Sequence, residues 1–145
     1  MTAPNPGLPN PGPPKPGPNL DGLTGDWYGF LAQGELRFQQ CASCGRWRHP
    51  PRIACAGCGA DGWSWETSSG RGEVHSWTVS HQALHPAWAA EVPYAIVVAA
   101  LEEPGVRLVA GWDGPLDGLA LGVPLVVGLE TRDEGLVVPR LRPAG

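Results

Sequence analysis

Two cysteine pairs constrain the fold of this chain more than any other feature of its sequence. Cys41-Ala-Ser-Cys44 and Cys55-Ala-Gly-Cys58 are C-x-x-C pairs separated by ten residues, and they contain all four cysteines. Two thiolates at this spacing hold one metal ion from a tight turn, and two such turns complete a tetrahedral site. Each pair is followed by glycine, which we expect to turn the backbone so that N–H groups point at the sulfurs. The predicted ligands of one Zn²⁺ are Cys41, Cys44, Cys55 and Cys58, with iron bound as in rubredoxin as the alternative metal.

Four thiolates close the coordination shell, whereas a catalytic zinc keeps one position open. We therefore expect a structural ion within a zinc ribbon that spans residues 39–67. A segment of this size has too little core to fold without metal. Two disulfides are the competing interpretation, but the pairs suit a reducing compartment and metal binding better.

No coherent active site emerges from the remaining residues. The chain lacks a nucleophile elbow, a phosphate-binding loop and a dinucleotide fingerprint, and Lys15 is its only lysine. His81 and His85 have helical spacing, but Pro86 follows and indicates a loop. A hydrolase that uses one of these two histidines is the weakest functional hypothesis. His75 is expected to be packed or to face a partner.

His49 is expected to be solvated or hydrogen-bonded, because it lies beside two prolines in the ribbon. The acid pairs Glu102-Glu103 and Asp133-Glu134 lie at turns, where solvated charge is the ordinary interpretation. The sequence thus predicts no catalytic residue.

Charge is distributed unevenly along the chain. Residues 36–60 carry four arginines and no acid, whereas residues 61–145 carry five arginines and eleven acids. Arg46, Arg48 and Arg52 are candidate contacts to phosphate or to a partner protein, because guanidinium groups bind both through paired hydrogen bonds. A ribbon followed by a barrel could also hold a single-stranded nucleic acid, which is our alternative function. The acidic second half argues against it.

The pattern after the ribbon predicts a mainly β fold. Five strands are expected at 74–80, 94–101, 106–112, 123–131 and 136–141, which suits an OB-type barrel over residues 68–142. In the first strand, His75, Trp77 and Val79 should share one face and Val74 the other. The connection at 113–122 should cap the core through Leu116, Leu119 and Leu121.

Residues 21–38 are expected to be helical, in two short pieces because Gly29 and Gly34 interrupt them, with Thr24 as the N-cap. An aromatic stripe in this segment is a candidate partner-docking surface, formed by Trp27, Tyr28, Phe30 and Leu31. Residues 1–20 are rich in proline and glycine, and we expect a disordered tail. Pro11 and Pro14 have the spacing of a PxxP ligand.

Together these features resemble the DUF35 family, over about residues 24–142. The most specific points are the two C-x-x-C-G pairs with Pro50-Pro51-Arg52 between them, and Pro93-Tyr94. The start of the barrel adds a further motif, made of Gly70, Gly72, Ser76, Trp77 and Thr78.

The resemblance implies an OB-fold protein with a rubredoxin-like zinc ribbon and no catalytic residues of its own. Such proteins are accessory subunits of thiolase-superfamily enzymes, including lipid-transfer-protein-like thiolases or aldolases of steroid side-chain and lipid degradation. A MaoC-like hydratase is a further implied neighbour, and acyl-CoA would lie at the shared interface. No segment reaches the length of about 20 apolar residues that a membrane helix needs, and no secretory signal is visible, so a cytoplasmic location is expected.

Overall fold

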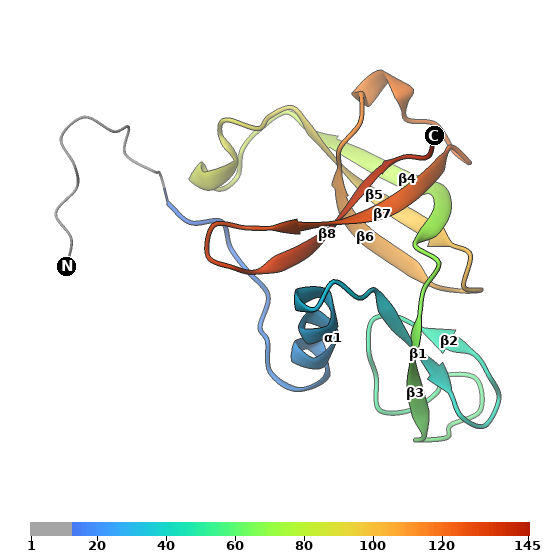
Figure 1. Cartoon of the computed structure of the whole chain (residues 1–145). Coiled ribbons are helices and arrows are strands. Elements are labelled where there is room, and N and C mark those ends of the chain that lie inside the picture. The colour runs from blue at the N-terminus through green and yellow to red at the C-terminus, as the bar shows by residue number, and fades with distance from the viewer. Residues whose placement is uncertain (1–12) are drawn as a thin grey trace, which may run out of the picture.

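A helix, a three-stranded ribbon and a barrel follow one another in a computed structural model that describes residues 13–145 (Figure 1). The helix is α1 (Gly22–Ala32). The ribbon consists of β1 (Arg37–Cys41), β2 (Trp47–Arg48) and β3 (Trp63–Thr67). The barrel strands are β4 (Arg71–Ser80), β5 (Tyr94–Leu101), β6 (Arg107–Trp112), β7 (Pro124–Thr131) and β8 (Val137–Pro143). Two 3₁₀ turns, η1 (Pro86–Trp88) and η2 (Leu116–Gly118), lie in the barrel connections.

The helical segment is one continuous helix, so the expected break into two pieces is wrong. Asp21 occupies the N-cap position, and Thr24 lies inside the first turn. Trp27 and Leu31 lie one turn apart and are both buried. The free energy gained by packing these side chains exceeds the cost of the low helix propensity of glycine. The helix ends just before Gly34, whose φ of 80° is the left-handed conformation common after a helix C-terminus.

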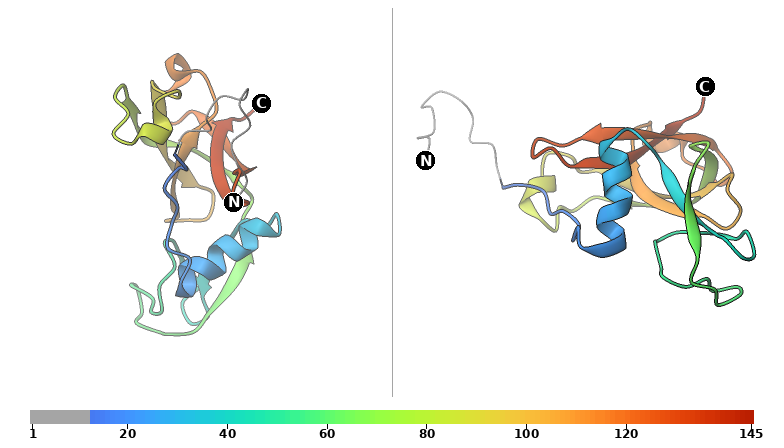
Figure 2. Two further views of the ribbon diagram at one scale, coloured as in Figure 1. Left: turned by 90° about the vertical axis from the view of Figure 1, so that its left-hand side faces the viewer. Right: turned by 60° about the horizontal axis from the view of Figure 1, so that its bottom comes forward.

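The ribbon is an antiparallel sheet in the order β2-β1-β3. Its central strand presents Phe38 and Gln39 to opposite faces, and both side chains are fully buried. Phe38 belongs to the core that the helix and barrel share. In both views of Figure 2, α1 lies outside the barrel and next to the ribbon, and it contacts β8 and β1.

The five remaining strands close into a barrel in the order β4-β5-β6-β8-β7. All neighbours are antiparallel except β6 and β8, which pair in parallel. This is the five-stranded Greek-key arrangement of an OB-fold, so the expected fold class is confirmed. The first strand begins at Arg71 and is longer than predicted.

An irregularity in β4 overturns the predicted alternation. The register shifts between Val74 and Ser76, so His75 is an extra residue in this strand. Val74 and Trp77 consequently lie opposite Ala99 and Val97, two buried residues on the inner face of β5. Val74 therefore shares a face with Trp77, contrary to the strict period-two pattern.

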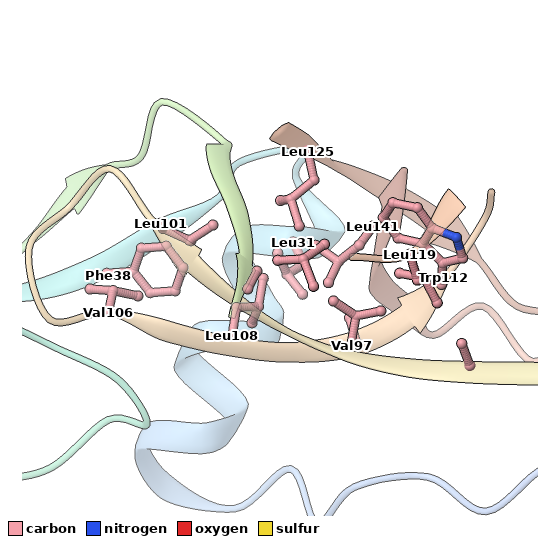
Figure 3. Close-up of a cluster of buried hydrophobic side chains, with 14 of the residues drawn as sticks. Leu31, Phe38, Val97, Leu101, Val106, Leu108, Trp112, Leu119, Leu125 and Leu141 are labelled. Atoms are coloured by element: carbon pink, nitrogen blue, oxygen red, sulfur yellow. The ribbon is translucent and has the colours of Figure 1, made fainter. Parts of the chain in front are cut away.

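The core lies within the barrel and is closed by elements outside it. Figure 3 shows Leu31 from α1 among barrel side chains such as Val97 and Leu141. In the connection that contains η2, Leu119 is buried and Leu116 packs against the core, as expected. Leu121 does not, because 72% of its surface is exposed at the turn before β7.

Residues 13–20 have defined contacts, although they belong to the segment expected to be a disordered tail. Lys15 forms a 2.6 Å ion pair with Glu91 and lies 4.5 Å from the ring centroid of Trp88. Arg132 donates a hydrogen bond of 3.0 Å to the carbonyl of Pro16. The rest of that segment, including Pro11 of the PxxP pair, lies outside the described residues. No helix within residues 13–145 has both the length and the apolar character that crossing a membrane requires.

Two glycines of α1 provide a matched test of the helix packing. A Cβ at Gly25 would lie 1.9 Å from the carbonyl oxygen of Leu20, whereas a Cβ at Gly29 meets nothing within 4 Å. We predict that Gly25→Ala destabilises the protein by about 1–3 kcal/mol through overpacking. Gly29→Ala should stabilise it by about 0.5–1 kcal/mol, because alanine loses less backbone entropy in a helix. Urea unfolding of both variants measures this, and equal effects of one sign would contradict the described packing.

Candidate metal centre

Each cysteine pair forms the same tight turn. Cys41 ends β1, and the backbone N–H of Gly45 donates to its carbonyl at 3.0 Å. In the second pair, the N–H of Gly59 donates to the carbonyl of Cys55 at 2.8 Å. Gly45 and Gly59 have φ values of 77° and 78°, a conformation that strains any residue with a Cβ. Glycine after each pair therefore allows the sharp turn of the backbone, as expected.

The two turns bring four sulfur atoms together. All four Sγ atoms lie within 4.8 Å of one another, and Cys41–Cys58 and Cys44–Cys55 each have Sγ atoms 3.6 Å apart. A disulfide needs a separation of about 2.05 Å. Zn–S bonds of about 2.3 Å in a tetrahedron place sulfurs about 3.8 Å apart, so the donor set and spacing fit a tetrahedral metal ion. These four cysteines form a rubredoxin-like zinc-ribbon site.

Backbone N–H groups within each pair stabilise the first thiolates. The N–H groups of Cys44 and Ser43 hydrogen-bond to the Cys41 sulfur and lower its pKa to about 6. Those of Cys58 and Gly57 lower the pKa of Cys55 in the same way. The N–H groups that support the Cys41 and Cys55 sulfurs thus belong to residues inside the pairs, whereas the N–H groups of Gly45 and Gly59 donate to carbonyl oxygens.

The fourth ligand behaves differently. The backbone N–H of Ala60 favours the Cys58 thiolate, but the neighbouring thiols, Cys41 foremost, and burial outweigh it and raise its pKa to about 11. Burial and the neighbouring thiols thus favour the protonated form of Cys58, whereas a metal ion binds the thiolate.

The three candidate arginines of the ribbon have different surroundings. Arg48 is used internally: its guanidinium donates to the side-chain oxygen of Gln39 at 3.0 Å and to the carbonyl of Arg52 at 2.9 Å. The Arg52 side chain is exposed, and only its backbone is engaged, through an N–H bond of 2.8 Å to Gln39. Arg46 lies beside the metal-binding turns. Sequence reasoning missed Gln39, because a single glutamine in a strand gives no signal that it will be fully buried.

The histidines do not form a second metal site. Within residues 13–145, no other group of His, Cys, Asp and Glu side chains comes close enough to hold an ion. His85 Nδ1 instead accepts a hydrogen bond of 3.1 Å from the N–H of Ala87 and caps η1. His49 lies between the rings of Trp27 and Phe38, with centroids 4.9 and 5.1 Å away. His49 is partly buried against these rings, a packing role that the sequence did not predict, and burial lowers its pKa to about 4.

Glu103 also departs from its predicted role. Its side chain is only 7% exposed, and it accepts a hydrogen bond of 2.8 Å from the N–H of Ser69. The carboxylate therefore ties the turn after β5 to the segment that joins ribbon and barrel. The solvated turn expected for Glu102-Glu103 holds only for Glu102, which is exposed.

The helical stripe proposed as a docking surface is mostly used inside the chain. Trp27 and Leu31 are 4% and 1% exposed and belong to the core. Phe30 packs on Trp65, with ring centroids 5.3 Å apart, and Tyr28 is partly buried against the core. Trp27 and Leu31 thus leave no apolar surface for a partner.

The fold and the site define a protein in which a zinc ribbon precedes an OB-fold barrel. Residues 30–64 match the family described as "ChsH2, rubredoxin-like zinc ribbon domain", and residues 65–130 match "ChsH2, C-terminal OB-fold domain". The chain belongs to this ChsH2 family of DUF35 proteins.

Two solved structures are similar. A chain of the "Ltp2-ChsH2(DUF35) aldolase" is 36% identical with a TM-score of 0.78, and the match covers 90% of this chain and all of that one. A DUF35 protein of unknown function from Sulfolobus solfataricus shares the fold at 17% identity, with a TM-score of 0.59 and coverage of 86% and 87%.

A curated relative extends beyond the region of similarity. The "Probable enoyl-CoA hydratase alpha subunit" of Thermomonospora curvata is 37% identical over 119 residues. The match covers 81% of this chain but only 36% of that protein, so the chain spans about a third of the relative's length.

The four-sulfur arrangement predicts that each ligand is required for the ribbon. Replacing any one of the four cysteines by serine should abolish stoichiometric metal binding and unfold the ribbon, because structural zinc contributes on the order of 10–16 kcal/mol in finger peptides. Mass spectrometry of metal content and tryptophan fluorescence would measure both effects. Ser43→Ala, inside the first pair, should retain one ion per chain. A Cys44→Ser variant with full metal content and an unchanged spectrum would contradict the site.

The partly buried imidazole of His49 predicts a defined dependence of stability on pH. Folding lowers the pKa of His49 from 6.5 to about 4. As pH falls below 6.5, the unfolded chain takes up a proton that the folded chain excludes, so stability is lost down to pH 4. Because His49 is only partly buried, we expect the loss at pH 5 to be about 1–2 kcal/mol relative to pH 7.5.

Urea unfolding of the wild type and of His49→Gln at both pH values isolates this loss, because protonation of the thiolates affects the two proteins alike. His49→Gln should show the smaller decrease. The exposed His81 provides the control, and His81→Gln should lose as much unfolding free energy between the two pH values as the wild type does. An equal loss of stability in the wild type and in His49→Gln would contradict the lowered pKa of His49.

Proposed function

We propose that this protein is a non-catalytic subunit that binds a thiolase-superfamily enzyme of the lipid-transfer-protein-like type and supports its acyl-CoA chemistry. The observation that carries the proposal is the 36% identity to a chain of the Ltp2-ChsH2(DUF35) aldolase, over 90% of this chain and the whole of that one. The site supports it as well, because four cysteine ligands leave no open position on the metal for a substrate.

Zinc serves as the single structural cofactor in this proposal. It would be held by the four cysteines and would supply folding free energy to the ribbon, whose described side chains bury little besides Phe38 and Gln39. The ion takes no part in turnover, which remains with residues of the partner enzyme.

The outer face of β5 and β6 supports docking of that enzyme. Val98 lies opposite Val109, and Ile96 is the next outward-facing residue of β5; we call these three residues the docking face. Val109 is 60% exposed, and all three side chains point away from the barrel core. An aliphatic group at the centre of a solvent-facing sheet is typical of a protein-binding surface.

The same face argues against the single-stranded nucleic-acid alternative. OB-folds hold oligonucleotides on the face of their second and third strands, which are β5 and β6 here. Such binding uses aromatic side chains for base stacking and a positively charged groove. The docking face is aliphatic, and residues 61–145 carry more than twice as many acids as arginines.

The finer parts of the proposal concern the substrate and a second neighbour. In this proposal the exposed Arg52 side chain contacts a CoA phosphate or the partner enzyme, because its guanidinium forms no hydrogen bond or ion pair with a described residue. Association with a MaoC-like hydratase is supported by the description of the Thermomonospora relative as a probable enoyl-CoA hydratase subunit. The pathway we propose is steroid side-chain or lipid degradation, in the cytoplasm.

Co-expression with a lipid-transfer-protein-like thiolase tests the proposal. The wild-type chain should co-purify with the enzyme, and Val109→Lys should weaken the complex at least tenfold, because a charge would be buried at its centre. Leu121→Lys is the matched control, since Leu121 is an exposed aliphatic residue outside the docking face, 72% exposed against 60% for Val109. Calorimetric titration gives both affinities. The proposal fails if the wild-type chain does not bind, or if only the control variant loses binding.

A further inference from the structure

Arg46 contacts both metal-binding turns. Its backbone carbonyl accepts a hydrogen bond of 2.8 Å from the N–H of Cys41, the first ligand. Its side chain crosses to the second pair and covers Gly57. A Cβ at Gly57 would lie 2.7 Å from Cδ of Arg46 and 2.8 Å from both Nε and Nη1. One residue thus joins the two halves of the site, through its main chain and its side chain.

The guanidinium lies against the group that supports a ligand sulfur. The N–H of Gly57 donates to Sγ of Cys55 at 3.4 Å, and the Arg46 side chain packs directly on this glycine. Arg46 has no carboxylate partner among residues 13–145, and the chain contains no acid between residues 36 and 60. The Cys55 thiolate lies next to the glycine on which this unpaired guanidinium packs.

Charge balance explains why a cation belongs here. Four thiolates around a divalent ion carry a net charge of −2, which backbone N–H groups offset only in part. A guanidinium beside the thiolates offsets this negative charge, and so it stabilises the metal-bound set of ligands against loss of the ion. Because Arg46 is exposed, the effect is moderate and screened by salt.

We propose that Arg46 is the counterion of the metal centre: its guanidinium, held across Gly57, stabilises the four thiolates and slows release of the ion. Arg46 then acts as a positioning residue of the site and is removed from the candidate contacts to CoA or to a partner. Arg48 and Arg52 do not share this role, because Arg48 is bound to Gln39 and the Arg52 side chain is engaged by no described residue. This inference rests on the metal site but not on the proposed partner.

Zinc transfer from the full-length chain to a chromophoric chelator is the test. Arg46→Gln should release zinc about 3–10-fold faster than the wild type at low ionic strength, and the difference should shrink in high salt. Arg46→Lys should be intermediate, because it keeps the charge but not the planar fork. Arg52→Gln is the matched control, since it removes an equal charge from the same ribbon, and its release rate should equal that of the wild type.

Gly57→Ala removes the Arg46 guanidinium from the metal site in a second way. The added methyl group displaces the Arg46 side chain while leaving its charge in the protein. It should accelerate release, and in the double variant Gly57→Ala/Arg46→Gln the two effects should not add. Circular dichroism of the zinc-loaded proteins confirms that each is folded. The inference is overturned if Arg46→Gln releases zinc at the wild-type rate, if Arg52→Gln has the same effect, or if the two substitutions are additive. None of these measurements involves the enzyme partner, so the inference and the proposed function fail separately.

Discussion

Closure of four thiolates around one ion is the constraint on which the rest of this structure depends. Cys41 is the last residue of β1, the central strand of the ribbon, and Phe38 of the same strand enters the core shared with the barrel. A metal that fixes Cys41 therefore also fixes the position at which Phe38 meets Trp27 and His49. Helix α1 completes this arrangement, because Trp27 reaches the ribbon and Leu31 reaches the barrel. Metal, ribbon, helix and barrel are thus linked through one strand and one helix.

The ribbon and the barrel are stabilised by different interactions. The barrel closes through its own strand pairing and contains most of the buried aliphatic side chains. The ribbon has few buried residues and relies on its ion, on the Gln39–Arg48 hydrogen bond and on the helix. A chain built in this way offers stable surfaces, which suits the proposed role of a subunit that serves the chemistry of another protein.

Local sequence patterns predicted the fold because they report directly on local chemistry. The C-x-x-C-G pairs specify the metal-binding turns, and the alternating strands with their turn residues specify the barrel. The errors concern tertiary packing, which no local pattern encodes. Gly29 suggested a broken helix, but burial of Trp27 and Leu31 against other elements keeps it continuous. The sequence predicts a solvated Glu103, yet its carboxylate accepts from a backbone N–H that is 34 residues away in the chain. It also gives no sign that His49 packs against two aromatic rings.

The accessory role, the structural ion and the counterion argument all require a shell made of sulfur alone. X-ray absorption spectroscopy at the zinc edge, on the purified full-length protein, measures that shell directly. The account predicts four sulfur scatterers at about 2.3 Å and no nitrogen or oxygen in the first shell. Three sulfurs with one lighter scatterer would reveal an open position held by water, and would contradict the proposal that this chain leaves catalysis to a partner.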